Sequence, residues 1–369
     1  MPTPSTGYDL ATVSNPDSAL TDFTLVVDLS TMSEDWWDEV DTSDGTKGRA
    51  YAVDGDDENE SELACDWVGF DNTGETGLLH VKWAGSLASS GTQKLRVYPP
   101  VSGNDSVAHD GTYGQDNAYD ANWGFNSPDM DDDRVAGATA TGTGSVSIGG
   151  GTGPIWKATA FDGTDDGIGY GTDGNIEGTG DYTVSMWVKG NGSQTSSIAE
   201  QRNGDYRGTW QWKVDSLEPR WGCYAGHGGQ SSAWDPTVSP LWGATTSVVD
   251  NAWHHVVVVN ASGTLTGFFD SVEKTSDTDT TGTDLNENVS FCAGYDQRQS
   301  DDHFTGSLAQ FQIHNAARVA DWIEHDYAQT NDNATFWGTW TWQTGEAPVA
   351  VAPTGNLAGP LAGPFAGVL

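Results

Sequence analysis

The sequence predicts an all-β protein with two domains. Short apolar runs separated by Gly, Asn and Asp recur along all 369 residues, and glycine alone contributes 47 of them, which is typical of strands joined by tight turns. A helical period occurs in one stretch only, residues 318–327. We therefore expect an N-terminal β-sandwich, a C-terminal jelly roll and one short helix near the C-terminus, because this length accommodates two domains and linkers.

The chain is strongly acidic, with 53 Asp and Glu residues against 15 Lys and Arg residues and a net charge of −38. Such a surface repels phosphate backbones and anionic lipid heads, which excludes nucleic acid and membrane surfaces as partners. No segment is apolar enough for membrane insertion. Two compatible interpretations remain: solubility in concentrated salt, as in a halophilic or marine source, and binding of divalent cations by clustered Asp residues.

The N-terminal residues and the cysteines indicate whether the protein is exported and whether it contains disulfides. Residues 1–9 have neither the basic region nor the apolar core of an export signal, so we expect no export by the usual routes if Met1 is the true start. Cys65, Cys223 and Cys292 are widely spaced, which predicts neither a disulfide framework nor a cysteine metal site. We expect buried free thiols, with a Cys223–Cys292 bridge as the alternative.

Residues 1–100 form the first predicted domain, with strands expected at residues 23–29, 78–83 and 94–98. The acidic residues 54–62 are interpreted as a solvated hairpin tip. Several short motifs resemble the small β-sandwich family known as the domain of unknown function DUF2341, which has no assigned chemistry and usually accompanies laminin-G-like domains. These motifs are Leu20-Thr-Asp-Phe23, Asp44-Gly-Thr-Lys47, Asp66-Trp-Val68, the strand at 94–98, and the run from Tyr113 to Tyr119.

Two low-complexity segments flank the second domain. Residues 101–147 are rich in Gly, Asp, Asn and Ser, and we expect a solvated connector. Residues 344–369 contain Leu-Ala-Gly-Pro twice in tandem, at 357–360 and 361–364, and proline at this spacing predicts an extended tail. The tail is nearly uncharged in an acidic chain, so we infer that it docks onto a partner subunit; disorder is the alternative.

Residues 148–343 form the second predicted domain. An acidic turn at 162–166 is followed by strands expected at 181–188, 251–259, 265–270 and 304–313, and then by the helix at 318–327. The order of an F-D-G turn, a T-x-x-x-W-V strand, a W-H-H-V strand and an F-x-G strand resembles the laminin-G-like jelly roll of the concanavalin-A-like superfamily. Ser271 replaces the Gly that usually follows the Asp closing the third strand of that family.

The sequence does not favour catalysis. Jelly-roll glycosidases resembling this domain place carboxylates as E-x-D-x-x-E on one strand, where alternate residues face the same cleft, and no such run occurs. The nucleophile elbow, the H-E-x-x-H zinc motif and the phosphate-binding loop are absent as well. His254 and His255 are adjacent on a predicted strand and should point to opposite faces, which favours structural roles over a shared metal ion.

Two acidic turns are candidate calcium ligands, because Ca²⁺ prefers six to eight oxygen ligands. The resemblance to laminin-G-like domains implies an ion at the rim of the sandwich. We expect the two turns to approach each other, and solvated acidic loops are the alternative. The candidate ligands are Asp162, Asp165 and Asp166 in the first turn, and Asp296, Asp301 and Asp302 in the second.

Aromatic side chains concentrated in residues 202–242 are candidates for sugar recognition, because their flat faces stack on pyranose rings. The alternative is that these rings fill the sandwich core; Trp210 and Trp212 share a strand face and point the same way in either case. The candidate residues are Arg202, Tyr206, Trp210, Trp212, Trp221, Tyr224 and Trp234.

Together these features favour a non-enzymatic protein of a virion surface, such as a head decoration, turret or tail fibre, that binds a host-surface glycan. Its tail would contact other virion subunits, and a homo-oligomer, with a trimer favoured, would strengthen weak glycan contacts through avidity. The alternative is a cellular or secreted carbohydrate-binding adhesin. A glycosidase with an unrecognised site is a weaker third hypothesis.

Overall fold

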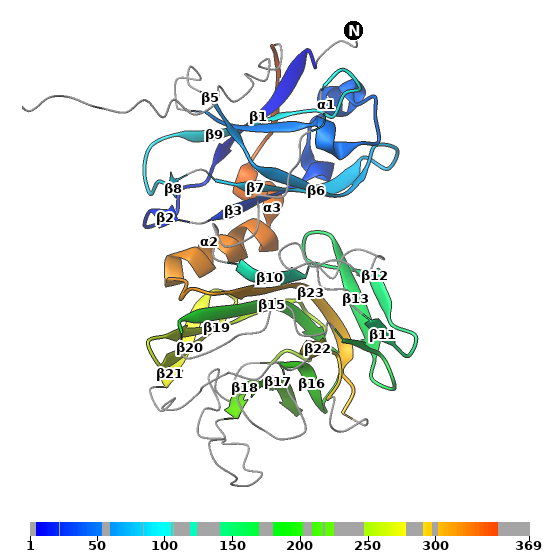
Figure 1. Cartoon of the computed structure of the whole chain (residues 1–369), viewed down its shortest axis with the longest axis vertical. Coiled ribbons are helices and arrows are strands. Elements are labelled where there is room, and N and C mark those ends of the chain that lie inside the picture. Colours follow the sequence, from blue (N-terminus) through cyan, green and yellow to red (C-terminus); the bar gives the residue numbers. More distant parts are fainter. Residues whose placement is uncertain are drawn as a thin grey trace, which may run out of the picture.

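The computed structural model describes residues 5–21, 23–53, 60–83, 85–104, 106, 119–123, 141–169, 180–201, 209–216, 218–224, 247–277, 291–296 and 302–345. Two β domains are stacked along the long axis, with two helices between them (Figure 1). The all-β class, the jelly roll and the helix near the C-terminus are confirmed.

The N-terminal domain packs two main sheets against each other. One has the strand order β24-β1-β9-β4-β5 and the other β3-β7-β6, while β2 and β8 form a small pair. All strand contacts within these sheets are antiparallel. The strands are β1 (Gly7–Val13), β2 (Leu20–Thr21), β3 (Thr24–Asp28), β4 (Arg49–Val53), β5 (Glu60–Leu63), β6 (Cys65–Asp71), β7 (Thr76–Lys82), β8 (Ser86–Leu87), β9 (Gln93–Tyr98) and β24 (Thr341–Thr344).

A short helix, α1 (Glu34–Glu39), closes one end of this domain. Ser33 caps it by accepting a hydrogen bond from Trp36 N. The buried carboxylate of Asp9 holds the cap in place by accepting hydrogen bonds from Ser33 N and Ser33 Oγ, each at 2.7 Å. Trp36 is fully buried and donates from Nε1 to Val97 O at 2.9 Å. The cap therefore orients the helix so that its indole rings fill the core.

The second domain is a sandwich of an eight-stranded and a six-stranded sheet. The larger sheet runs β12-β13-β23-β15-β19-β20-β21, with β10 also paired to β23, and the smaller runs β11-β14-β22-β16-β17-β18. The strands are β10 (Tyr119–Trp123), β11 (Thr141–Thr143), β12 (Ser147–Thr152), β13 (Lys157–Asp162), β14 (Gly167–Gly169), β15 (Tyr182–Gly190), β16 (Gln194–Gln201), β17 (Thr209–Ser216), β18 (Glu218–Tyr224), β19 (His254–Ala261), β20 (Thr264–Phe269), β21 (Val272–Asp277), β22 (Phe291–Ala293) and β23 (Thr305–His314).

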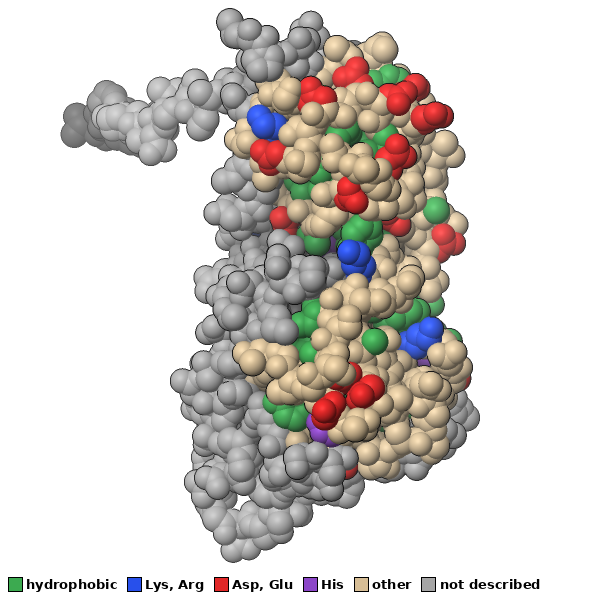
Figure 2. All heavy atoms as spheres, turned by 90° about the vertical axis from the view of Figure 1, so that its right-hand side faces the viewer, with side chains coloured by type: hydrophobic (Ala, Val, Ile, Leu, Met, Phe, Trp, Pro, Cys, Tyr) green, Lys and Arg blue, Asp and Glu red, His purple; other side chains and the backbone are tan. Residues whose placement is uncertain are grey.

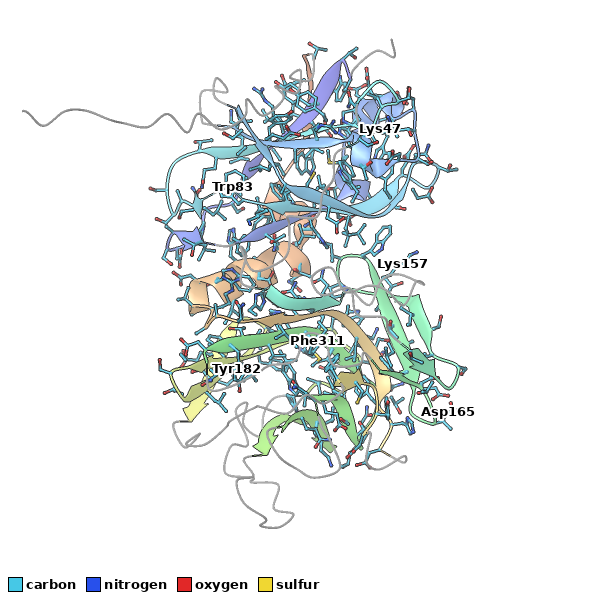
Figure 3. All side chains as sticks on the ribbon, in the orientation of Figure 1. Lys47, Trp83, Lys157, Asp165, Tyr182 and Phe311 are labelled. Atoms are coloured by element: carbon cyan, nitrogen blue, oxygen red, sulfur yellow. The ribbon has the colours of Figure 1, made fainter. Side chains whose placement is uncertain are left out.

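Strand β15 is central to the larger sheet and is buried on both faces. Val184, Met186 and Val188 point into the sandwich core. On the opposite face Trp187 stacks on Tyr327, with ring centroids 5.5 Å apart. Tyr327 belongs to α2 (Ala320–Asn331), the longer of the two helices between the domains. The outer face of this sheet is thus the platform on which the helices sit (Figure 3).

The two domains share one hydrophobic core. Val257, Val259 and Phe268 of the jelly roll belong to the same buried cluster as the core of the N-terminal domain. The helices α2 and α3 (Asn333–Trp337) contribute to this cluster as well. A second contact is made beside the β12–β13 hairpin, where Ile155 packs with residues of β3, β6 and β7.

The observed elements correct the expected domain boundaries. Strand β24 pairs with β1, so the predicted boundary at 343 falls inside a strand that completes the N-terminal sheet. The expected connector at 101–147 contains two strands of the jelly roll. Strand β10 belongs to its larger sheet and β11 to its smaller sheet. The local sequence shows neither pairing, because short strands acquire their partners only in the folded chain. The predicted helix is confirmed as α2, which begins at Ala320 and continues to Asn331.

Cys65 and Cys292 are buried free thiols, as expected. Burial raises the pKa of the Cys65 thiol to about 12, which makes it unreactive near neutral pH. The alternative of a Cys223–Cys292 bridge is wrong, because Cys292 is free. Among the described residues, no helix combines the length and the apolar character needed to cross a membrane.

Candidate functional site

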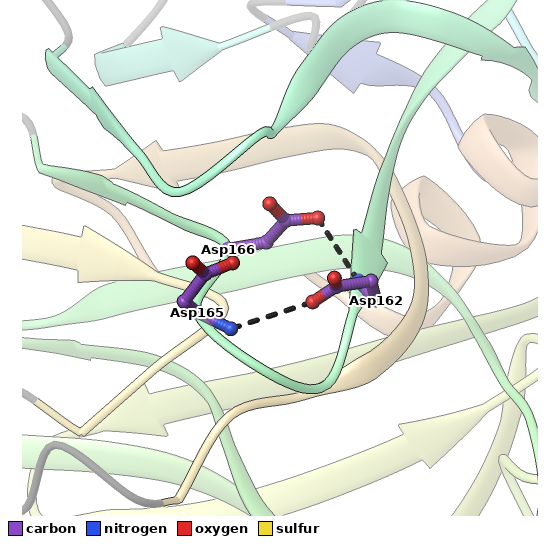
Figure 4. A group of neighbouring side chains, drawn as sticks. All are labelled: Asp162, Asp165 and Asp166. Atoms are coloured by element: carbon purple, nitrogen blue, oxygen red, sulfur yellow. Dashed lines mark hydrogen bonds between the residues drawn. The ribbon is translucent and has the colours of Figure 1, made fainter.

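The acidic turn that follows β13 lies at the rim of the jelly roll, where Asp165 marks its position (Figure 3). Asp162 is the last residue of β13 and is paired with Thr305 of β23, so two strands of the sheet fix the start of the turn. One carboxylate oxygen from each of Asp162, Asp165 and Asp166 lies within 4.8 Å of the others (Figure 4). The three carboxylates are therefore close enough to share an ion, and the metal site itself stays a prediction.

Backbone N–H groups hold the turn in shape. Asp162 Oδ1 accepts hydrogen bonds from Thr164 N at 2.7 Å and from Asp165 N at 3.4 Å. Asp166 Oδ2 accepts one from Asp162 N at 3.0 Å (Figure 4). The hydrogen bond from Thr164 N is the main cause that lowers the pKa of the Asp162 carboxyl. Asp162 is therefore ionised at neutral pH, as a calcium ligand must be.

Three residues that the sequence analysis did not select support the turn. Ser145 N donates to Asp166 Oδ1 at 2.8 Å, and His303 Nδ1 lies 3.1 Å from Asp166 O. Gly144 has a φ of +68°, and a Cβ at this position would lie 2.5 Å from Asp165 O, so only glycine fits. Gly144 and Ser145 lie in the segment expected to be a solvated connector, and no local pattern distinguished them from its other small residues.

The second acidic turn is linked to the first by the side chain of His303, which follows it, rather than by its carboxylates. His303 contacts the first turn, as described above, but within the described residues Asp296 and Asp302 do not join the group of three. Asp296 is buried, and a carboxylate oxygen of Asp302 lies 3.8 Å from Lys213 Nζ. Asp301 lies outside the described residues.

Trp212 is a core residue, and the prediction that it contributes to a sugar-binding groove is wrong. Its side chain is fully buried in the sandwich core, where it packs with Ile198 and Val214. The strand period correctly shows which residues share a face, but it does not show which face points inward. A ring with no exposed surface cannot stack on a sugar.

The other aromatic candidates remain predictions. Trp210 lies in β17, and Trp221 and Tyr224 lie in β18, but their side chains are outside the described part of the chain. Arg202, Tyr206 and Trp234 are outside it entirely.

The face of the smaller sheet opposite the core carries a buried polar group. Gln211 Nε2 donates to Glu200 Oε2 at 2.8 Å, and Ser197 Oγ donates to the same oxygen at 3.3 Å. Glu200 is paired across the sheet with Gln211 and Cys292, neither of which is an acid. Glycoside hydrolysis requires two carboxyl groups about 5–10 Å apart. The immediate cross-strand neighbours of Glu200 therefore supply no second carboxyl group.

His254 and His255 point to opposite faces of the larger sheet, in agreement with the sequence analysis. His255 is buried and stacks on Trp187 with ring centroids 5.1 Å apart, and burial lowers its pKa to about 4. His254 lies between two carboxylates, with Nδ1 2.8 Å from Asp270 Oδ2 and Nε2 3.1 Å from Asp250 Oδ1. Burial alone would lower the pKa of His254, but these hydrogen bonds and charges outweigh burial and raise it.

Comparison with known proteins finds a family that resembles most of the jelly roll. Residues 161–324 match the family described as the concanavalin A-like lectin/glucanases superfamily. No curated protein matches the chain.

Solved structures that are similar to this chain share little sequence with it. Domain 4 of AbnA, a GH43 extracellular arabinanase from Geobacillus stearothermophilus solved with arabinotriose, is 21% identical with a TM-score of 0.41, over 57% of this chain and 98% of that one. The binding domain of Paraclostridial Mosquitocidal Protein 1 is 13% identical with a TM-score of 0.47, over 60% and 55%. The binding domain of botulinum neurotoxin serotype G is 12% identical with a TM-score of 0.44, over 57% and 50%. The chain therefore spans only about half of the two toxin domains.

Proposed function

We propose that the jelly roll is a non-catalytic carbohydrate-binding domain that uses a calcium ion at its rim. The observation that carries this proposal is the group of three carboxylates after β13, placed at the edge of a domain whose residues 161–324 match a lectin and glucanase superfamily. Calcium held at a rim can orient the turns around it and can accept sugar hydroxyls as additional oxygen ligands. The acidic turn is thus proposed to contribute to the binding surface.

Burial and strand register narrow the set of residues proposed to contact the sugar. Arg202, Tyr206, Tyr224 and Trp234 remain proposed contacts, while Trp212 is excluded by its burial. Trp210 and Trp221 are excluded as well, because the strand period and register place them on the same sheet face as Trp212. A lectin needs a few rings at the surface for stacking and nearby polar groups for the hydroxyls.

Two observations support binding without hydrolysis. Glu200 faces an amide and a thiol across the sheet rather than a second carboxyl group. Its carboxylate also accepts hydrogen bonds from Gln211 and Ser197, which help hold it in place. A general acid in a glycosidase requires a partner carboxylate acting on the same bond. We therefore propose no catalytic residue.

Calcium is expected to stabilise the chain against heat. With a dissociation constant of about 0.1–1 mM, which is common for extracellular modules, about 10 mM calcium should add roughly 1.5–3 kcal/mol to the free energy of unfolding. The Asp165→Asn substitution should abolish this gain, because Asp165 is exposed and its loss leaves the hydrogen bonds of Asp166 intact. Thermal melts with calcium, with equal magnesium and with chelator measure the effect.

The matched control is Glu273→Gln, which removes an exposed carboxylate from β21 far from the acidic turn in the sequence. This variant should respond to calcium as the natural chain does. Equal stabilisation of the natural chain by calcium and magnesium, or full calcium stabilisation of Asp165→Asn, would count against a calcium site at this turn.

A glycan array tests the ligand class directly. The chain is expected to bind a restricted set of glycans in calcium and to lose most of that signal in chelator. Alanine at Trp234 should weaken binding at least fivefold without shifting the melting temperature, because a stacked ring contributes about 1 kcal/mol or more. Alanine at Trp210 should instead lower the melting temperature, because Trp210 shares a strand face with the buried Trp212. If the Trp234 variant melts early instead, its ring belongs to the core and not to a groove.

We further propose that the domain is displayed on a virion surface in saline surroundings, with residues 1–100 forming a DUF2341-like domain. The charge of −38 supports the saline setting, and acidic side chains gather over both domains on the face that carries β11 to β13 (Figure 2). The core shared by the domains supports rigid display. Contact with other virion subunits through residues 344–369, and trimer formation, belong to this proposal.

A cellular or secreted adhesin is the alternative setting for the same binding domain. Mass spectrometry of purified virus particles separates the two settings. Recovery of this polypeptide from particles in stoichiometric amounts supports the virion, and its absence from every particle preparation refutes it.

A further inference from the structure

The sheet β24-β1-β9-β4-β5 carries tyrosines on the face that points away from the core of the N-terminal domain. Leu95 and Val97 of β9 lie in that core. Arg96 and Tyr98 alternate with them along the strand, so their side chains point to the opposite face. The strand register places Tyr51 of β4 directly beside Arg96. This sheet therefore buries one face in the core and presents aromatic rings on the other.

Three tyrosines on this outer face touch one another. Tyr98 contacts Tyr8 with ring centroids 5.1 Å apart and Tyr51 with ring centroids 5.5 Å apart. The guanidinium of Arg96 lies over the Tyr8 ring, 4.5 Å from its centroid. We call Tyr8, Tyr51, Tyr98 and Arg96 the tyrosine patch. Surfaces lined by aromatic rings are those on which proline-rich segments in the polyproline II conformation dock.

Most of the tyrosine patch is buried, although the described elements leave its side of the sheet open. Tyr98 is 1% exposed, Tyr51 is 5% exposed and Arg96 is 7% exposed. The second sheet of the domain and the helices α2 and α3 pack on the other side, in the shared core (Figure 1). Contacts within the patch cover the edges of the rings. The surface that points away from the sheet needs a cover that the described elements do not supply.

The chain reaches this face where β24 ends. Gly345, the last described residue, donates a hydrogen bond from its backbone N to Thr6 O at 2.8 Å. A Cβ at Gly345 would lie 3.3 Å from Tyr8 Cε1, so the chain leaves β24 beside the first ring of the patch. Eight extended residues reach about 25 Å, whereas the five strands of the sheet span about 19 Å. Residues 346–353 are therefore long enough to cross the whole face.

The composition of residues 346–353 matches such a surface. The segment reads Glu-Ala-Pro-Val-Ala-Val-Ala-Pro, and Glu346 is its only charged residue. Pro348 and Pro353 favour an extended backbone. The valines and alanines between them offer apolar side chains that gain free energy when aromatic rings cover them. In a chain with a net charge of −38, this segment is suited to a buried position rather than to water.

We propose that residues 346–353 dock across the tyrosine patch of their own chain, with the two prolines against the tyrosine rings and the Glu346 carboxylate near Arg96. The docked segment runs from β24 towards β5 and directs the repeats at 357–364 to the β5 edge of the sheet. The repeats stay available there for the subunit contact proposed above. This docking depends neither on a glycan nor on calcium.

Nitration of the full chain with tetranitromethane, with the modified tyrosines identified by mass spectrometry, tests this inference. Tyr51 and Tyr98 should react slowly in the natural chain. Val349→Asp combined with Val351→Asp places two charges in the docking segment and should raise the nitration rate of both tyrosines at least tenfold, because the undocked state becomes populated. Tyr182 in the jelly-roll core is 3% exposed, and its equally slow reaction in both proteins shows that the fold is intact.

The matched control places the same charges further along the tail. Leu357→Asp combined with Leu361→Asp should leave Tyr51 and Tyr98 as slow to react as in the natural chain. If the valine double variant also stays protected, another segment covers the patch; if both double variants lose protection, charge anywhere in the tail has this effect. Either result overturns the proposal. Nitration of the natural chain that becomes faster on dilution also overturns it, because the tail of a second copy would then cover the patch.

Discussion

Replacing Gln329 by leucine is expected to lower the free energy of unfolding by about 2–4 kcal/mol. Gln329 is fully buried in α2, and its side-chain amide pairs with the edge strand β3 as another strand would: Oε1 accepts from Val26 N at 2.9 Å and Nε2 donates to Thr24 O at 3.0 Å. Leucine has a similar volume but forms neither bond. The Val26 N–H would then be buried without this acceptor, at the usual cost of an unpaired backbone group.

Asn333, four residues further along, continues the same pattern. Its Oδ1 accepts from Asp28 N at 3.0 Å and its Nδ2 donates to Val26 O at 2.8 Å. Two amides on one side of the helices therefore cover consecutive polar groups of an edge strand that would otherwise be open to pairing with other chains. Asn333→Leu should destabilise the chain by a similar amount.

Urea unfolding followed by tryptophan fluorescence measures these changes. The matched control is Asn331→Leu, an exposed amide in the same helix, for which a change within about 0.5 kcal/mol is expected. Because the domains share one core, the natural chain should unfold in a single transition. A Gln329→Leu variant as stable as Asn331→Leu would show that these amides do not hold the domains together.

Acid is expected to destabilise the chain between pH 6.5 and pH 4 through three buried histidines. Burial lowers the pKa of His255 and of His325 to about 4, and it lowers the pKa of His314 well below 6.5. A histidine whose pKa is depressed by folding gains its proton more easily when unfolded. Its contribution to stability is therefore complete above pH 6.5 and is lost as the pH falls towards 4, by about 3 kcal/mol each for His255 and His325.

Asp326 opposes part of this loss. Burial raises the pKa of its carboxyl to about 6, so folding disfavours its charged form. The resulting penalty is present above pH 6 and is relieved as the pH falls towards 3.8, by about 3 kcal/mol. His254 opposes the loss as well, because hydrogen bonds and charges from Asp270 and Asp250 raise its pKa. The three buried histidines outweigh these two groups, and we expect a net loss of stability as the pH falls from 6.5 to 4.

The variant His325→Phe isolates one histidine from the effect of general surface charge. Phenylalanine can pack between Phe23 and Phe336 as the imidazole does, but it cannot be protonated. Relative to the natural chain, this variant should become more stable by about 3 kcal/mol between pH 7 and pH 4. Urea midpoints at several pH values measure the difference, and parallel pH profiles for the two proteins would contradict this account.

Much of the fold was predictable from the sequence because it rests on local patterns. The alternation in β15 identified a strand with one face in the core, and the order of turns and strands identified the jelly roll. The contacts that could not be predicted join residues that are far apart in the sequence. The bond between Val26 and Gln329 joins residues 303 apart in the sequence, and nothing near either residue indicates the other.

The candidate site was predictable to a similar extent. The carboxylates of the turn after β13 could be grouped because they are close in sequence, and the structure brings them together. The sequence did not predict that Gly144, Ser145 and His303 contact this turn, because these contacts form only when separate strands pair. Trp212 was misassigned because a strand pattern has two faces and the inward one is set by the opposite sheet.

One titration tests the central claim most directly. The best glycan from the array is titrated into the natural chain and into Asp165→Asn, in calcium and in chelator, and the recovered glycan is then assayed for new reducing ends. The account predicts saturable binding by the natural chain in calcium, at least tenfold weaker binding by Asp165→Asn or in chelator, and glycan recovered intact. Binding that is unaffected by calcium and by Asp165→Asn, or release of new reducing ends by the natural chain, would contradict it.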